Sequence, residues 1–273
     1  MQPGAPVQDL LAQAKAAREQ SDLAQAAHLL EKALEIDFDC RAGHIALAHI
    51  RFPGESYIQL LARIHHTRRP RTYIEIGVAN GSSIAQALPG CRRIGIDPAP
   101  TLTEPAPGVE VYCTTSDRLF ATADVRKILG GLPLDLAFID GMHLFEYVLA
   151  DFVNLERYCT ADSTILIHDC LPLNAVVAER DRRTQFWLGD VWRILPTLAH
   201  FRPDLSISVV AAPPSGLAVV RRLDPASDVL NARRAEALSF GAALPFTASQ
   251  SLATLGIKQV PSDWQEVSRL FAA

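Results

Sequence analysis

The sequence has few charged residues for its length and no large excess of either sign. Charged residues make up 21% of the 273 residues, and the formal net charge is -4. This balance excludes a protein that holds nucleic acid through a broad basic surface. No apolar run is long enough to cross a bilayer, and the first residues lack the pattern of a signal peptide. We therefore expect a cytoplasmic protein that binds neither nucleic acid nor membrane.

Cysteine is also scarce and has no paired spacing. The five cysteines form no Cys-x-x-Cys and no zinc-finger pattern. An odd number of such residues indicates reduced thiols rather than a disulfide framework. Hydrophobic residues, by contrast, make up 49% of the chain. That content suffices for one large core with an appendage.

The stretch from Tyr73 to Asp97 predicts the opening β-α-β unit of a doubly wound sheet. A buried strand, Tyr73 to Ile76, leads into a glycine turn and a short helix from about Ser82. A second strand, Arg93 to Ile96, then ends in the carboxylate of Asp97. Sheets of this kind bind ligands beyond the carboxyl ends of their strands, and the acidic residue accepts hydrogen bonds from ribose hydroxyls.

The spacing of this turn favours one class of ligand over another. The fingerprint of a dinucleotide-binding site is Gly-x-Gly-x-x-Gly. This chain instead has Gly77-x-x-x-Gly81, with Ala79 between the two glycines. The two glycines allow a sharp bend and close approach of a ligand. Glu75, inside the strand, suits a ligand that carries positive charge, because an opposite charge keeps a buried carboxylate ionised.

Residues 75–82, Glu-Ile-Gly-Val-Ala-Asn-Gly-Ser, resemble the first motif of the class I S-adenosyl-L-methionine (SAM) methyltransferases, whose ligand carries an ammonium and a sulfonium group. In that class the polar end of the third strand contacts adenine, although Ser-Asp is also an ordinary helix cap. The residues that the resemblance implies for the cofactor are Glu75, Gly77, Gly81, Asp97, Ser116 and Asp117.

Two further buried strands end in polar residues. Leu134 to Ile139 is followed by Asp140 and His143, and Thr164 to Ile167 is followed by His168-Asp169. Continuous apolar runs mark strands buried on both faces. Carboxylates that converge at one sheet edge suit a divalent cation, which lowers the pKa of a bound hydroxyl. His143 could then take the proton; the alternative is a pair of capped turns without metal.

The pattern Asp-Gly-x-His, followed by an acidic pair after the next strand, resembles metal-dependent sugar O-methyltransferases of natural-product pathways. The resemblance implies that Asp140 and Asp169 are metal ligands and that His143 is the base. His168 departs from the pattern, since those enzymes have a carboxylate there. Imidazole suits zinc or manganese better than magnesium, so the metal differs, or His168 only orients its neighbours, or no metal binds.

The first 53 residues predict a small helical module. Residues 33–44 resemble the junction of two tetratricopeptide repeats, and only about one and a half such repeats of roughly 34 residues would fit. The module either docks partners or a second chain, or covers the sheet as a plain helical extension. We expect residues 54–224 to form the catalytic domain and residues 225–273 a helical extension. Either terminal segment could pair two subunits.

The chain from about Tyr57 to Arg222 resembles a methyltransferase-24-like group of bacterial enzymes. We therefore predict an α/β fold with a Rossmann-like sheet, a closing antiparallel hairpin and SAM-dependent methyl transfer to a hydroxyl of a small-molecule or sugar-containing acceptor.

Residues 179–185 lie where a substrate lid would be. A SAM-fold scaffold without activity and a nicotinamide-dependent oxidoreductase are the alternatives. Asp151 is assigned no catalytic role.

Overall fold

A computed structural model describes residues 4–102 and 104–272. Its strands form one sheet in the order β3-β2-β1-β4-β5-β7-β6-β8. The strands β1 to β5 run parallel, β7 is antiparallel to both β5 and β6, and β8 is parallel to β6. The bounds are β1 Thr72–Ile76, β2 Arg92–Ile96, β3 Val109–Tyr112, β4 Leu136–Ile139, β5 Thr164–His168, β6 Ser206–Ala211, β7 Leu217–Arg221 and β8 Lys258–Pro261.

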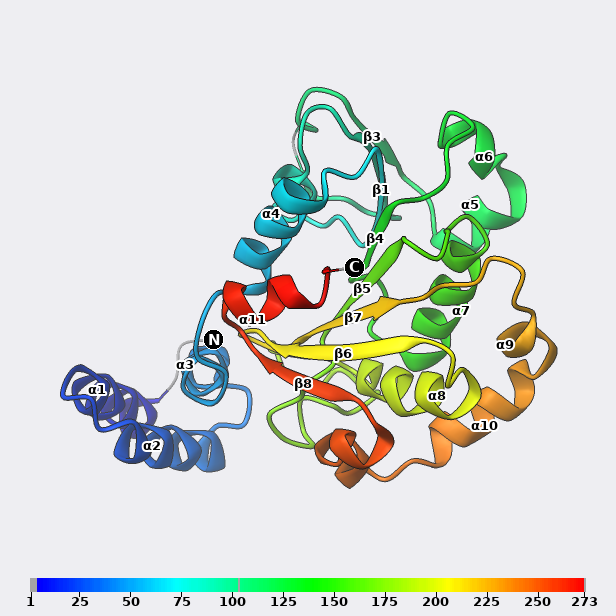
Figure 1. Cartoon of the computed structure of the whole chain (residues 1–273). Coiled ribbons are helices and arrows are strands. Elements are labelled where there is room, and N and C mark those ends of the chain that lie inside the picture. Colours follow the sequence, from blue (N-terminus) through cyan, green and yellow to red (C-terminus); the bar gives the residue numbers. More distant parts are fainter. Residues whose placement is uncertain (1–3, 103, 273) are drawn as a thin grey trace.

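Helices cover both faces of this sheet (Figure 1). One face packs against α5, α7, α8 and α10, and the other packs against α4 and α11. The α-helices of the described chain are α1 Ala5–Glu19, α2 Leu23–Ile36, α3 Arg41–Arg51, α4 Tyr57–Arg68, α5 Ser116–Thr122, α6 Val125–Ile128, α7 Phe145–Glu156, α8 Ile194–Phe201, α9 Val229–Ala232, α10 Arg234–Ala243 and α11 Trp264–Arg269. The fold is the predicted doubly wound sheet with a closing hairpin.

The strands β1, β4 and β5 are buried along their whole length, as expected for apolar strands covered on both faces. Their parallel registers align the last residues: Ile76 pairs with Ile96 and with Ile139, and Ile139 pairs with Ile167. The residues that follow these strands therefore lie along one edge of the sheet. The strand order reverses between β1 and β4, and such a switch point opens a crevice for ligands.

One predicted helix is wrong in extent. The helix from about Ser82 is a single 3₁₀ turn, Ile84–Gln86, because Pro89 disfavours helical geometry just before it. Farther along the chain, residues 116–128 form two helices, α5 and α6, rather than one. Asp124 separates them and caps α6 by accepting a hydrogen bond from the Lys127 N–H at 3.1 Å.

The N-terminal residues form α1, α2 and α3, as predicted, with Asp22 capping α2 through the Gln25 N–H at 2.9 Å. Ala14, Ala26, Leu30 and Leu47 give this module a small core of its own. Figure 1 shows the three helices beside the sheet domain. The likeness to a tetratricopeptide repeat and the domain boundaries stay predictions.

The C-terminal segment contributes more than the predicted helices, because β8 adds a strand to the sheet beside β6.

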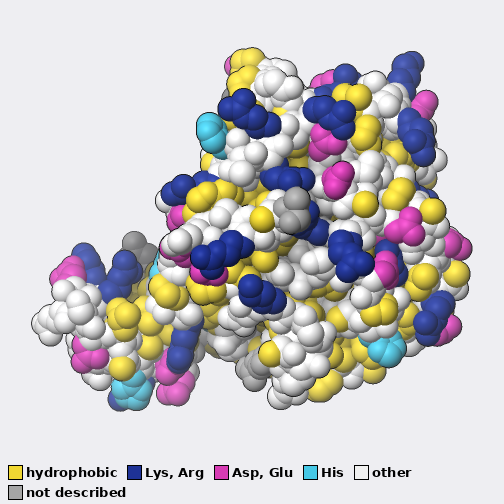
Figure 2. All heavy atoms as spheres, in the orientation of Figure 1, with side chains coloured by type: hydrophobic (Ala, Val, Ile, Leu, Met, Phe, Trp, Pro, Cys, Tyr) yellow, Lys and Arg dark blue, Asp and Glu magenta, His cyan; other side chains and the backbone are white. Residues whose placement is uncertain are grey.

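Acidic and basic side chains are interspersed over the face shown in Figure 2, as the small net charge of -4 leads one to expect. Among the described residues, no helix is long and apolar enough to span a membrane.

Candidate active site

Two adjoining cavities lie at the carboxyl edge of the sheet. The larger one, of about 680 Å³, is lined by Asp97, Ser116 and Asp117 among others. The smaller one, of about 300 Å³, lies beneath the segment that contains Trp187. The residues that line both cavities are Gly77, Ala79, Asp140 and His143. A group held in one cavity would therefore meet a group held in the other at Asp140 and His143.

The turn after β1 depends on glycine at its first position. Gly77 has φ +89°, and a Cβ there would lie 2.0 Å from the carbonyl oxygen of Asp140. Only glycine lets the ends of β1 and β4 approach so closely. Gly81 has φ +78° and closes the turn with an N–H bond of 2.8 Å to the Val78 carbonyl. It is not among the residues that line the two cavities, so it shapes the turn instead.

Asp97 is held rigidly at the edge of the larger cavity. Its Oδ2 accepts the Ala79 N–H and its Oδ1 accepts the Ala99 N–H, both at 2.8 Å. Ala79 has φ +44°, a left-handed conformation that points its N–H at Asp97. Each carboxylate oxygen keeps a further lone pair for a ligand, which agrees with the predicted role in holding ribose.

Glu75 lies behind the turn and lines neither cavity. Its buried carboxylate accepts hydrogen bonds from the Tyr73 hydroxyl at 2.6 Å and the Ser83 hydroxyl at 2.5 Å. Burial raises its pKa to about 8. The carboxylate that was expected to bind the ligand is therefore already bonded within the protein. Ser83 lines the smaller cavity and connects Glu75 to it.

Ser116 and Asp117, at the start of α5, lie in the wall of the larger cavity. Thr115, not Ser116, is the cap of α5, since its Oγ1 accepts the Arg118 N–H at 3.3 Å. Ser116 and Asp117 are thus not needed as caps. Asp151, to which the sequence analysis assigned no catalytic role, is buried in the same wall. Its place on the apolar face of α7, between Val148 and Leu155, could have revealed it.

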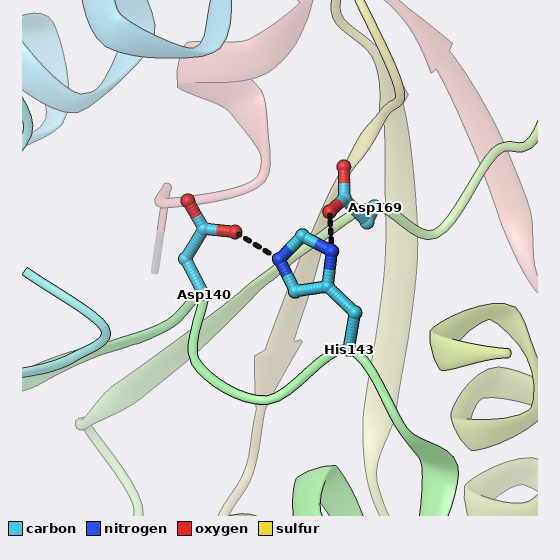
Figure 3. Close-up of side chains that lie close together, drawn as sticks. All are labelled: Asp140, His143 and Asp169. Atoms are coloured by element: carbon cyan, nitrogen blue, oxygen red, sulfur yellow. Dashed lines mark ion pairs between the residues drawn. The ribbon is translucent and has the colours of Figure 1, made fainter. Parts of the chain in front are cut away.

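His143 stands between the two strand-end carboxylates (Figure 3). Its Nε2 is 3.5 Å from Asp140 Oδ1, and its Nδ1 is 3.1 Å from Asp169 Oδ2. The ring stacks on Trp187 with centroids 5.4 Å apart. Burial alone would lower the pKa of His143, but the carboxylates of Asp169 and Asp140 outweigh it and raise the pKa to about 9. A pKa of this size leaves the imidazole mostly protonated at neutral pH.

His168 lies deeper and contacts the same carboxylates. Its Nδ1 is 3.1 Å from Asp140 Oδ1 and 3.3 Å from Asp169 Oδ1, and its Nε2 bonds to the Ser215 hydroxyl at 3.2 Å. Tyr57 packs on the ring at 3.9 Å. Burial opposes a charge on His168, yet the two carboxylates raise its pKa. In turn, the two histidines outweigh burial and hold the pKa of Asp140 well below its usual range.

The donor atoms that come together are not quite the predicted set. Ligand atoms of Asp140, His143 and Asp169 lie within 4.8 Å of one another, so the described residues gather two carboxylates with His143 as the third donor. His168, the predicted third ligand, instead makes hydrogen bonds to Asp140 and to Ser215, and it lies within ion-pair distance of Asp169. Two carboxylates and an imidazole form a mixed set of oxygen and nitrogen ligands. Such a set fits manganese or zinc better than magnesium, which prefers oxygen ligands.

The smaller cavity is covered by residues 185–188, and the N-terminal module supports this cover. The Gln185 N–H and side-chain amide donate to Asp39 at 2.6 and 3.1 Å, and Phe186 stacks on His44 with centroids 5.6 Å apart. Arg41 of the module also lines the cavity. The helical module is therefore part of the site's wall. Trp192, by contrast, is buried in the core.

Residues 74–170 match the model of a family described as a methyltransferase domain. The chain therefore contains a methyltransferase domain. The methyltransferase is similar in structure to cofactor-bound Rv0187 from MTB, with a TM-score of 0.50 and 19% identity over 82% of this chain and 100% of that chain. This likeness shows the fold.

Two other solved structures are similar to the methyltransferase. The O-methyltransferase TomG from Streptomyces achromogenes, in complex with SAM, gives a TM-score of 0.48 and 18% identity over 61% of this chain and 79% of that chain. The SAH-bound methyltransferase PaMTH1 from Podospora anserina gives a TM-score of 0.45 and 15% identity over 66% of this chain and 86% of that chain. No curated protein sequence matches the chain.

Proposed function

We propose that the methyltransferase transfers the methyl group of SAM to a hydroxyl oxygen of a small-molecule acceptor. SAM occupies the larger cavity and the acceptor occupies the smaller one. The observation that carries this proposal is that Asp140 and His143 line both cavities. A methyl group donated from one side and an oxygen presented from the other would meet beside a base.

The cofactor residues of this proposal follow the larger cavity. Gly77 admits the methionine part to the turn, Asp97 holds the ribose hydroxyls, and Ser116 and Asp117 flank the adenine. Asp140, near the junction, offers negative charge to the sulfonium. Glu75 and Gly81 act through the shape of the turn rather than by touching SAM.

His143 accepts the acceptor's hydroxyl proton in this mechanism. The oxygen's electron pair forms the bond to the methyl carbon while the bond from that carbon to sulfur breaks, leaving S-adenosyl-L-homocysteine (SAH). Because Asp169 and Asp140 raise the pKa of His143 to about 9, the base must first lose a proton. Positive charge beside these carboxylates, from the sulfonium or a metal ion, offsets their attraction for that proton.

A divalent metal fits the same residues. Asp140 and Asp169 would hold it, with His143 or His168 as the nitrogen neighbour, and magnesium, manganese and zinc are the candidates. Such an ion would supply charge that lowers the pKa of the acceptor hydroxyl. Without it, His168 already lies 3.1 Å from Asp140 and 3.3 Å from Asp169, and these carboxylates raise its pKa. A sugar-containing acceptor, a cytoplasmic location and pairing of subunits through the terminal helices stay predictions.

The first experiment is a calorimetric titration of the chelator-treated protein with SAM, followed by magnesium, manganese or zinc titrated into the complex. Release of SAH is then followed with a panel of hydroxyl compounds. Binding of SAM together with turnover of a hydroxyl acceptor supports the proposal, and heat from one metal supports the Asp140 and Asp169 site. Binding of SAM with turnover only of amines or thiols would contradict the oxygen acceptor.

A further inference from the structure

Asp151 is a buried carboxylate that the proposed chemistry does not use. It lies on α7, its exposed fraction is 2%, and it lines the larger cavity together with Ser116 and Asp117. The residues around it on α7 are apolar and belong to the core, among them Val148 and Phe152. An acidic side chain at such a place is costly unless hydrogen bonds compensate its burial.

One oxygen of Asp151 has no such bond. Its Oδ1 is fully buried and has no hydrogen-bond partner among the described residues. The neighbouring Ser116 side chain lowers the pKa of this carboxyl group, yet burial dominates and raises the pKa to about 7. Buried polar atoms in folded proteins are almost always paired. The unpaired oxygen at the cavity wall is therefore suited to a donor supplied by a ligand.

The order of residues along the cavity indicates which part of SAM reaches Asp151. The methyl group must lie at Asp140 and His143, where the two cavities join, and Asp97 lies beyond them at the end of β2. The base then occupies the remaining end, between the start of α5 and α7. Adenine offers one N–H donor group there, its 6-amino group, while its ring nitrogens accept.

We propose that Asp151 accepts a hydrogen bond from the 6-amino group of the cofactor's adenine and so makes the site specific for an adenosine-based cofactor. This inference rests on the proposed placement of SAM in the larger cavity. Asp117 lies on the same wall but is exposed, so water can satisfy its carboxylate. The Oδ1 atom of Asp151 is buried and has no such alternative.

The test compares SAH with its purine riboside analogue, which lacks the 6-amino group, by calorimetry on the full chain. We expect the wild-type protein to bind SAH about 10- to 100-fold more tightly, the range for a hydrogen bond to a charged group. Asp151→Leu should bring this ratio close to one. Asp151→Asn keeps an acceptor oxygen and should retain most of the preference, which a purely structural role would not predict.

Each binding result either supports or overturns the proposed role of Asp151. Equal binding of the two ligands by the wild-type protein overturns the proposal, even if the Leu variant does not fold. An unchanged preference in a folded Leu variant overturns it too, because another group then recognises the amino group. Failure of the wild-type protein to bind SAH at all would instead contradict the placement of the cofactor, and so the proposed function itself.

Discussion

The imidazole of His143 bridges Asp140 and Asp169, with Nε2 3.5 Å from one carboxylate and Nδ1 3.1 Å from the other. The three residues come from the loop after β4 and the end of β5, two strands that pair in parallel. Among the described residues, His143 is the one histidine that lines both cavities. The bridge holds its imidazole at the place where methyl transfer would occur.

Replacing His143 by alanine should leave SAM affinity nearly unchanged and lower turnover by roughly 10²–10⁴-fold, the range for lost general-base catalysis. The reason is that His143 borders the junction rather than the adenosine end of the cofactor cavity. Calorimetry with SAM and the rate of SAH release measure the two quantities separately. Full activity in this variant would remove His143 from the reaction.

Asp97→Ala should weaken SAM binding by about 10- to 100-fold, because the carboxylate is expected to accept bonds from ribose hydroxyls. It also frees the N–H groups of Ala79 and Ala99, so part of the loss comes from a looser turn. Asp162→Ala is the matched control, since Asp162 is exposed and precedes β5 at the opposite edge of the sheet. Equal SAM affinity in the two variants would show that Asp97 is not a ligand.

Gly77→Ala should destabilise the protein by roughly 2–5 kcal/mol, from a strained φ and a clash with the Asp140 carbonyl. Gly131→Ala separates the two causes. Gly131 also has a positive φ, +78°, but nothing lies within 4 Å of a Cβ there, so only about 1 kcal/mol of strain is expected. Urea unfolding of both variants measures the difference. Similar losses in the two would mean that the clash is relieved by movement of β4.

His65→Leu should reduce the sensitivity of the fold to acid. His65 is buried, its two ring nitrogens have no hydrogen-bond partner in the described chain, and burial, with the charge of Arg93, lowers its pKa to about 4. A folded pKa below the unfolded value near 6.5 means that stability is full above pH 6.5. It then falls as the pH drops toward 4, by up to about 3 kcal/mol.

The measurement is the unfolding free energy between pH 4 and 7.5. His66→Leu is the control, because the neighbouring His66 is exposed and should leave the pH dependence as in the wild-type protein. A wild-type slope in the His65 variant would show that other groups cause the acid sensitivity. The sequence analysis had no means of separating these two adjacent histidines in burial.

The sequence by itself determined the frame of the site. Apolar runs ending in Asp97, Asp140 and Asp169 predict parallel strands, and parallel strands deliver the residues after them to one edge. The glycine turn after β1 is likewise a local property, since a positive φ and a close backbone neighbour require glycine wherever they occur. These features follow from short stretches of chain and were predicted correctly.

Only the tertiary structure decided which side chains face the cavities. Glu75 makes hydrogen bonds to Tyr73 and Ser83 and lines neither cavity, and Asp151 reaches the wall of the larger cavity because α7 packs beside α5. Arg41 lines the smaller cavity although about a hundred residues separate it from Asp140 in the chain. Such contacts depend on how helices pack on the sheet, through many weak apolar interactions spread over the whole core, which no local pattern encodes.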